Sequence, residues 1–224
     1  MEVLMIAELV RSSITLLFPD PCQACGKRPA ARPLPICGDC MALLARGATP
    51  AAVSSRYIEN IFSCLPYEGA IKKCVTSFKY SGKLKFMSVF ERLIGRAVMK
   101  NTFRLCGADI IVPVPMHPVK KYRRGFNQAE IIARVLSVLL SVRTDVRVLI
   151  KKRNTPAQSR SSRKKRFRNL KNSFAVVDRL KIVGRSVVLV DDVMTTGATL
   201  DECARELRKA GAKSVRAFTL ARTL

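Results

Sequence analysis

The sequence predicts an α/β fold in which a parallel β-sheet is flanked by helices, with a small cysteine-rich module before it. Apolar, β-branched runs at 109–114 and 187–190 have the length of buried central strands, and a helical pattern follows each run. Two Cys-x-x-Cys pairs lie close together near the amino terminus. A chain of 224 residues is long enough for one substantial core and a small appendage.

Residues 1–18 are apolar at a rough helical spacing and predict an N-terminal helix. This helix either packs on a domain or rests on a membrane surface, and a polar side poor in Lys and Arg favours packing. Glu2, Glu8 and Arg11 argue against a secretory signal and against a membrane-spanning helix. We therefore expect no membrane span and a cytoplasmic location.

Residues 19–44 read as a zinc-ribbon-like module. Its ligands would be Cys22, Cys25, Cys37 and Cys40. In a cytosolic chain, metal ligation explains clustered cysteines better than disulfides do, and two such pairs suit a tetrahedral four-thiolate Zn²⁺ site. Four thiolates leave no open position, so the zinc would be structural. A redox pair is the alternative. The remaining cysteines, Cys64, Cys74, Cys106 and Cys203, read as small buried hydrophobic residues.

A linker at 45–55 leads to the α/β domain at 56–224. Within it we expect strands at 57–67, 109–114, 146–150, 184–193 and 214–221, and helices at 68–80, 84–99, 128–140 and 199–210.

The charge balance is strongly basic, because 41 Lys and Arg against 16 Asp and Glu give a formal net charge of +25. Such a surface attracts nucleic acid or a phosphorylated small ligand, or is simply solvated. The most basic segment, 151–172, reads as a lid over a polyanionic substrate or as a track for nucleic-acid phosphates. Its only aromatic residue is Phe167, which argues against a base-stacking platform.

A proline-rich basic loop at 113–128 follows the strand at 109–114. Its cations are Lys120, Lys121, Arg123 and Arg124. Gly125 permits a turn, and Asn127 with Glu130 resembles a capping box for the next helix. If the two central strands are neighbours, this loop faces the loop at 195–199 and suits a pyrophosphate. The alternative is a flexible basic loop that is exposed to solvent and binds no ligand.

The stretch at 187–199 reads VVLVDDVMTTGAT and predicts a strand, a loop and a helix start. Backbone N–H groups at a helix start, with Gly197 allowing close approach, favour a phosphate. Asp191 and Asp192 at the carboxyl end of the strand repel phosphate, so they need sugar hydroxyls or a Mg²⁺ ion beside a pyrophosphate. The alternative is that both acids are ordinary surface residues.

This stretch resembles the phosphoribosyl pyrophosphate (PRPP) motif of type I phosphoribosyltransferases. The resemblance implies that Asp191 and Asp192 hold the ribose and that the following loop holds the 5′-phosphate. The implied PRPP-binding residues are Asp191, Asp192, Val193, Met194, Thr195, Thr196, Gly197, Ala198 and Thr199, with Mg²⁺ accompanying the ligand.

Over almost its whole length the chain also resembles the ComF family of competence proteins. The matching features are the cysteine module, the string VPVPMHPVKKYRRGFNQAE at 112–130, the segment TPAQ at 155–158 with Arg166 and Asn169, and the PRPP-type motif. One departure is SRSSRKKR after Gln158, where the family leads us to expect a leucine. This resemblance implies a role in DNA uptake during natural transformation, with the competence machinery as partners.

An active enzyme of this kind would displace pyrophosphate from ribose C1 through an oxocarbenium-like transition state. The acids would hold the ribose, and Lys120, Lys121, Arg123 and Arg124 would stabilise the leaving group. Thr195 stands where purine-salvage members place an assisting acid, which disfavours a purine acceptor of that type. His117 is either a proton carrier or a plain loop residue.

Three functional hypotheses remain from the sequence. The chain is an active phosphoribosyltransferase with an unidentified acceptor, a binding module that uses the nucleotide site in DNA uptake, or a protein that binds single-stranded DNA directly. The complete motif at 187–199 favours PRPP binding, and the charge of +25 favours a role in DNA handling.

Overall fold

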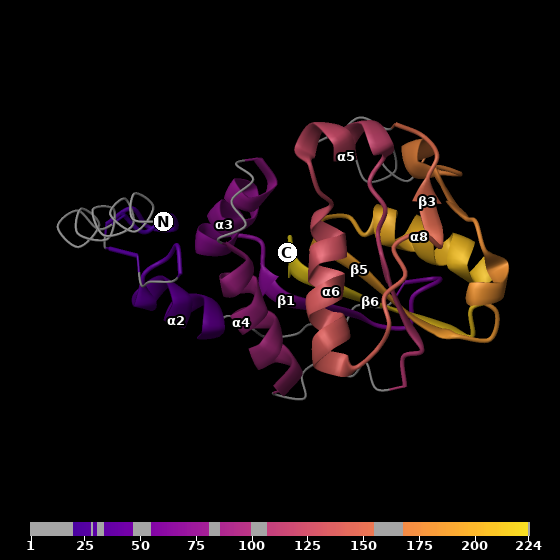
Figure 1. The fold of residues 1–224 in the computed structure, drawn as a ribbon, viewed down its shortest axis with the longest axis horizontal. Coiled ribbons are helices and arrows are strands. Elements are labelled where there is room, and N and C mark those ends of the chain that lie inside the picture. The colour runs from indigo at the N-terminus through magenta and orange to yellow at the C-terminus, as the bar shows by residue number, and fades with distance from the viewer. Residues whose placement is uncertain are drawn as a thin grey trace, which may run out of the picture.

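Four parallel strands form the central sheet, in the order β1-β6-β5-β2 (Figure 1). The strands are β1 (Ile61–Pro66), β2 (Ile110–Pro113), β5 (Ser186–Met194) and β6 (Ser214–Arg222). This computed structural model describes residues 20–27, 29–30, 34–46, 55–80, 86–99, 107–154 and 168–223. The predicted helix at 1–18 and most of the basic segment at 151–172 lie outside those ranges.

Helices cover both faces of the sheet. One face carries α3 (Gly69–Tyr80), α4 (Met87–Met99) and α6 (Gln128–Leu140), and the other carries α8 (Ala198–Lys209). Strand β5 shows why both faces are apolar, because Val188 and Val190 join the first core and Val187 and Leu189 join the second. This alternation confirms the prediction that the run at 187–190 is a central strand buried on both sides.

A two-stranded antiparallel hairpin lies on the same face as α8. It pairs β3 (Leu149–Lys151) with β4 (Phe174–Val176), and Leu149 and Phe174 contribute to the same core as α8. The sequence predicts a short strand at 146–150 and no strand at 174–176. A strand of three residues is too short to show a recognisable alternation of apolar and polar residues, so the sequence pattern does not predict β4.

The helices form where the apolar spacing predicts them. In α3, Ile71, Val75 and Phe78 lie on one side and are all buried. Helix α6 begins as predicted behind Asn127, whose side chain accepts a hydrogen bond from the Ala129 N–H at 3.1 Å. Glu130 accepts hydrogen bonds from Lys121 Nζ at 2.7 and 2.9 Å and from the Asn127 side-chain amide at 3.5 Å, so it contacts the cap through the side chain of Asn127.

The segment after β2 differs from its prediction. We predicted a basic loop, and the structure instead places Lys120, Lys121, Arg123 and Arg124 in a short helix, α5 (Pro118–Arg124). His117 caps this helix by accepting from the Val119 N–H at 3.3 Å, and Pro118 occupies the first turn, where proline is tolerated. Gly125 ends the helix with a φ of 83°, so the predicted turn is confirmed.

Strand β5 also runs further than predicted. Its last residues continue to pair with β6, as Val193 with Ala221 and Met194 with Arg222, whereas its pairing with β2 stops at Val190. The acid pair therefore lies within the strand, at the point where one neighbour has ended and the other continues. A 3₁₀ turn, η2 (Arg179–Lys181), precedes this strand and was not predicted.

The cysteine module is joined to the sheet domain through a shared core. Helix α2 (Gly38–Arg46) packs against α3 and α4, at one end of the long axis in Figure 1. Cys22, Ile36 and Leu44 belong to the same apolar cluster as the buried side of α3. Helix α2 continues to Arg46, and Ala45 is buried, so the first two residues of the predicted linker at 45–55 belong to this helix. Residues 47–54 of that linker lie outside the described residues. No helix of the described ranges is both long enough and apolar enough to cross a membrane.

Candidate phosphoribosyl site and cysteine centre

Asp191 and Asp192 lie side by side on β5 and are both partly buried. Each carboxylate accepts a hydrogen bond from the next backbone N–H, Asp191 from Asp192 at 2.8 Å and Asp192 from Val193 at 2.7 Å. These bonds occupy one oxygen of each carboxylate and hold its orientation. The pair therefore presents fixed acceptors within β5, beyond the end of its neighbour β2, and not at the strand end, where the sequence led us to expect the acids; β5 ends at Met194.

The loop from β5 to α8 provides the start of a helix next to these acids. Gly197 has a φ of 77° and is the residue before the first turn of α8. Only glycine adopts this left-handed conformation without strain, which explains its place in the loop. The Thr196 hydroxyl accepts from the Ala198 N–H at 3.5 Å. The first N–H groups of a helix have no intrahelical acceptors, so this loop suits an anion.

Lys79 joins the acid pair from a distant part of the sequence. Its Nζ lies 2.8 Å from Asp192 Oδ2, and the two side chains are 21% and 13% exposed. The lysine comes from the last turn of α3, the helix that directly follows β1 in the chain. Sequence analysis did not single out this residue. The available signal was its position next to Phe78, at the margin of the apolar face of α3.

Electrostatic interactions extend from the acids to a second lysine. Burial and the neighbouring charge of Asp192 raise the pKa of Asp191 to about 7, while Lys79 and Lys151 act in the opposite direction. Burial and the charge of Lys120 lower the pKa of Lys151, against the attraction of Asp191. Lys151 also places Nζ 5.2 Å from the centre of the Phe174 ring. The acid pair is thus in contact with a lysine of α3 and within the electrostatic influence of a lysine of β3.

The four cations of α5 do not act as one group. Lys120 is the member that faces Lys151, and burial together with the charge of Arg124 lowers its pKa. Lys121 is paired with Glu130, Arg124 donates to Gln128 Oε1 at 3.0 Å, and Arg123 is exposed. The structure therefore brings Lys120 near Lys151 and Arg124, whereas Lys121 is paired with Glu130 and Arg123 faces solvent.

The string at 124–128, RGFNQ, has clear structural roles. Gly125 ends α5, and Asn127 caps α6 while its amide donates to the Val114 carbonyl at 3.0 Å. The Phe126 ring packs on Phe78 with centroids 5.2 Å apart. The string fixes the turn after β2 against both the sheet and α3.

An open depression of about 570 Å³ lies between α5 and β3. Its lining includes Lys121 and Lys151 together with Met116, Tyr122 and Leu149, and neither carboxylate of the acid pair is part of it. The depression therefore contains two cations near the predicted site but not the acids.

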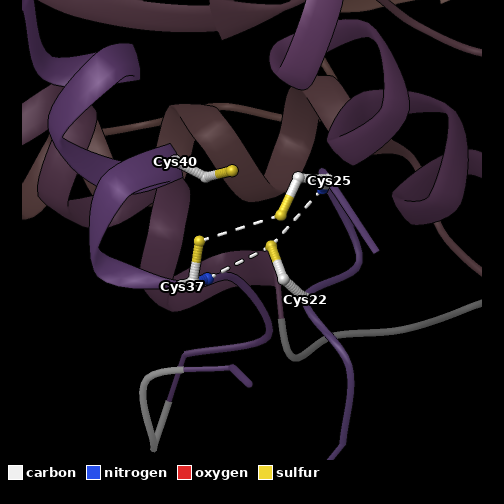
Figure 2. Close-up of side chains that lie close together, drawn as sticks. All are labelled: Cys22, Cys25, Cys37 and Cys40. Atoms are coloured by element: carbon white, nitrogen blue, oxygen red, sulfur yellow. Dashed lines mark hydrogen bonds between the residues drawn. The ribbon is translucent and has the colours of Figure 1, made fainter. Parts of the chain in front are cut away.

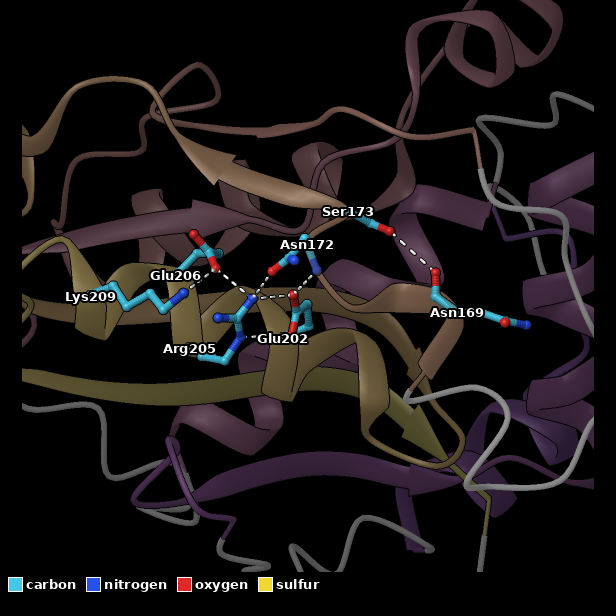
Figure 3. Close-up of polar contacts among 7 residues, drawn as sticks. All are labelled: Asn169, Asn172, Ser173, Glu202, Arg205, Glu206 and Lys209. Carbon is cyan, nitrogen blue, oxygen red and sulfur yellow. Dashed lines mark hydrogen bonds and ion pairs between the residues drawn. The ribbon is translucent and has the colours of Figure 1, made fainter.

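A polar network anchors the residues that follow the basic segment. Arg205 of α8 lies between Glu202, Glu206 and Asn172, with Nη2 at 2.6 Å from Glu202 Oε1, 2.7 Å from Glu206 Oε1 and 3.0 Å from Asn172 Oδ1 (Figure 3). The Asn172 N–H donates to Glu202 at 2.6 Å. Charge-assisted bonds of this kind are among the stronger polar contacts. They attach the chain that enters β4 to helix α8, which begins directly after Gly197.

The four predicted cysteine ligands come together at one point. The sulfurs of Cys22, Cys25, Cys37 and Cys40 all lie within 4.8 Å of one another and face a common centre (Figure 2). The Cys25 and Cys37 sulfurs are 3.9 Å apart. Tetrahedral Zn–S bonds of about 2.3 Å place sulfurs about 3.8 Å apart, so the cluster fits a metal such as zinc.

Backbone hydrogen bonds favour a thiolate in this cluster. The N–H groups of Cys37 and Cys25 donate to Cys22 Sγ at 3.2 and 3.5 Å. Burial acts to raise the pKa of Cys22, but these bonds outweigh it and lower the pKa to about 6. Of the cysteines predicted to be small buried hydrophobes, Cys64, Cys74 and Cys203 are buried as free thiols, whereas Cys106 lies outside the described residues.

Comparisons with known proteins agree with this arrangement. Residues 109–224 match the family described as Phosphoribosyl transferase domain. The chain is 31% identical over 217 residues to "Competence protein F" of Haemophilus influenzae, covering 90% of each chain. It is 34% identical over 168 residues to "DNA utilization protein YhgH" of Escherichia coli K12, covering 74% of this chain and 73% of that one.

A third relative is more distant. The chain is 28% identical over 217 residues to "Competence protein ComFC" of Bacillus subtilis, covering 95% of this chain and 82% of that one. Taken with the parallel sheet, the strand–loop–helix at 187–199 and the four-cysteine cluster, these matches show that the chain belongs to the phosphoribosyl transferase domain family and, within it, to the ComF family of competence proteins.

Proposed function

We propose that this protein binds PRPP, or a related phosphoribosyl ligand, where β5 passes into α8, and that it acts in DNA uptake. One observation carries the first part of the proposal. The partly buried acid pair and the start of α8 are joined by the short loop at 195–197, so carboxylates and an anion-binding helix start lie within reach of one small ligand.

The chemistry of the two halves suits the two ends of a phosphorylated ribose. Asp191 and Asp192 accept hydrogen bonds from the ribose hydroxyls, and the backbone N–H groups at 195–199 bind the 5′-phosphate. The same carboxylates are oxygen donors of the kind that Mg²⁺ prefers, so they fit a magnesium ion beside the pyrophosphate. When bound, the ion neutralises charge that develops on the leaving pyrophosphate.

A transfer reaction at this site would form a bond between an acceptor nitrogen and ribose C1 while the bond from C1 to the pyrophosphate oxygen breaks. Pyrophosphate leaves with the electron pair, and the acceptor loses its proton to solvent or to a nearby base. Lys120 and Lys151, on the α5 and β3 side of the acids, are the cations best placed to stabilise the leaving group. The position of Thr195 disfavours a purine acceptor that needs an acid there.

The role in DNA uptake rests on the relatives and on charge. Two relatives are named as competence proteins and a third as a DNA utilization protein. A net charge of +25 suits contact with the phosphates of single-stranded DNA, and proteins of the competence machinery would be further partners. We place this activity in the cytoplasm, where cysteines remain reduced and the four-thiolate cluster holds a structural zinc ion.

Titration of the purified protein with PRPP and Mg²⁺, with and without short single-stranded DNA, tests the proposal. PRPP binding should be lost in the double variant Asp191→Asn, Asp192→Asn. The matched control carries Glu59→Gln and Asp178→Asn, two exposed acids that lie outside the site. Equal PRPP affinity in the double acid variant would remove the ribose assignment.

The DNA arm of the same experiment separates the two functions. Salt-sensitive DNA binding that is unchanged in the acid variant would show that DNA contacts the chain away from the PRPP site. Absence of PRPP binding with DNA binding intact would mean that the fold serves as a DNA-handling scaffold and that the enzyme hypothesis fails.

A further inference from the structure

Lys79 reaches the acid pair from a part of the chain that the phosphoribosyl transferase match at 109–224 does not include. Its Nζ lies 2.8 Å from Asp192 Oδ2, the oxygen that is free of the backbone hydrogen bond made by Oδ1. Both side chains are largely shielded from solvent, at 21% and 13% exposed. A lysine held there loses side-chain entropy and hydration, which distinguishes this contact from an ordinary surface ion pair.

The last turn of α3 is fixed on several sides. Phe78, the residue before Lys79, packs on Phe90 of α4 and on Phe126, with ring centroids 5.1 and 5.2 Å apart. One turn earlier, Cys74 is fully buried in the core that α3 shares with the four-cysteine module. Packed rings and a shared core leave the helix little freedom to move, so the direction of Lys79 toward β5 follows from the packing of the whole amino-terminal half.

The charges of the acid pair determine the protonation state of Lys79. Asp191 and Asp192 repel each other, and burial with that repulsion raises the pKa of Asp191 to about 7. Burial acts to lower the pKa of Lys79, but attraction to Asp192 and Asp191 raises it overall, so its ammonium stays charged above neutral pH.

Other titratable groups face this cluster from neighbouring elements. Lys151 of β3 interacts with Asp191, Cys203 of α8 lies close enough to feel the same carboxylate, and Tyr67 at the end of β1 interacts with Lys79. Lys79 is the cation in direct contact with the pair among the described residues.

We propose that Lys79 is a positioning residue of the phosphoribosyl site, whose ammonium holds the Asp192 carboxylate in place beside Asp191 so that both carboxylates can accept hydrogen bonds from the ribose hydroxyls. This inference rests on the proposed function, because it assigns a role within the same site. It extends the site to α3, and so makes the amino-terminal half part of the ligand-binding machinery.

The role predicts a loss of affinity that is selective for the ligand. Without the contact to Lys79, the Asp192 carboxylate can turn about its side-chain bonds and is less well oriented toward the ribose. Lys79→Met should therefore bind PRPP about fivefold more weakly than wild type.

The experiment measures PRPP binding with Mg²⁺ by calorimetry in wild type, Lys79→Met, Lys79→Arg and Lys73→Met. Lys73 is an exposed lysine on the same helix, so its variant matches the loss of charge without touching the acids. Lys79→Arg should restore most of the wild-type affinity, because a guanidinium keeps a positive charge and donors beside Asp192. Inorganic phosphate without Mg²⁺ serves as a second probe that needs only the N–H groups at 195–199, and its affinity should change no more in Lys79→Met than in Lys73→Met.

Each outcome has a defined meaning. Weaker PRPP binding in Lys79→Met that the arginine variant restores, with phosphate binding unaffected, supports the positioning role. Equal weakening of both ligands, or PRPP affinity in Lys79→Met equal to that of Lys73→Met, overturns it. If wild type binds no PRPP, the proposed function itself fails, whereas a wild type that binds PRPP with the same affinity as Lys79→Met refutes only this inference.

Discussion

The rings of Phe78 and Phe126 pack with centroids 5.2 Å apart and join the last turn of α3 to the turn that precedes α6. Phe126 belongs to the string at 112–130 on which the ComF resemblance partly rests, and Phe78 precedes the lysine that contacts Asp192. The contact therefore connects that string to the acid pair through packing. It gives that string a structural reason that needs no contact with a ligand.

Replacing Phe126 with Ala should loosen this connection. Phe126 is partly buried, so the loss of its ring should lower the free energy of unfolding by about 1–3 kcal/mol. Freed of this contact, the last turn of α3 should hold Lys79 less firmly, and PRPP affinity should fall. Urea unfolding and PRPP titration measure the two effects. Phe126→Leu keeps most of the volume and serves as the control, and an alanine variant as stable as wild type would contradict the structural role.

Cys22→Ser should release the metal from the cysteine module. Cys22 accepts two backbone N–H bonds and is one of the four sulfurs of the cluster, so a hydroxyl in its place removes a thiolate ligand. We expect the zinc content to fall well below one ion per chain and the melting temperature to drop, because metal binding and folding of such a module are coupled. Elemental analysis and thermal unfolding measure both.

Cys64→Ala provides the comparison for the metal measurement. Cys64 is buried in β1 outside the four-cysteine cluster, so its loss creates a small cavity without removing a ligand. Metal content should stay at the wild-type value in this variant. Unchanged metal content in Cys22→Ser as well would end the four-thiolate assignment.

Asp191→Asn should stabilise the folded protein at neutral pH while it weakens ligand binding. The pKa of Asp191 is raised to about 7 in the folded chain, above the ordinary value of 3.8. The folded state then keeps a proton that the unfolded state has released, so the contribution of this group to stability falls as pH rises from about 4 to about 7. Asparagine removes that loss and should add about 1 kcal/mol above neutral pH, with a smaller gain near pH 4.

The neighbouring variant Asp192→Asn should behave in the opposite way. It takes the carboxylate from Lys79 and leaves a largely shielded ammonium without its partner, so the variant should lose stability by about 1–3 kcal/mol. Melting temperatures of both variants near pH 4 and near pH 8 give the comparison. A gain in Asp191→Asn that is as large in acid as at neutral pH would refute the assigned pKa effect.

Much of the fold was predictable because its signals are local. Buried strands at 109–114 and 187–190 and the helices around them are confirmed within a few residues, since apolar period and capping residues act over short distances. The errors follow from the same limit. The basic residues at 118–124 look like a loop beside three prolines, yet His117 and Pro118 begin a helix there.

In the candidate site, too, the features that depend on neighbouring residues could be predicted and those that depend on tertiary structure could not. The assignment of the acid pair, the phosphate loop and the four cysteines to ligand and metal depends on residues close together in the chain, and the structure brings the cysteine sulfurs together as expected. The grouping of Lys120, Lys121, Arg123 and Arg124 was an inference from spacing alone. In the helix, Lys120 and Arg124 are four residues apart and lie near each other, whereas Lys121 pairs with Glu130 and Arg123 is exposed.

By itself, the sequence determined the strand–loop–helix at 187–199, the metal-binding spacing of the cysteines and the membership of the ComF family. Each of these depends on contiguous residues or on short spacings along the chain. Tertiary structure alone decided which cation meets the acids. Lys79 contacts Asp192 because α3 packs between the cysteine module, α4 and the turn at Phe126, and such packing depends on side-chain shapes from distant segments. No local pattern of charge or hydrophobicity encodes that contact.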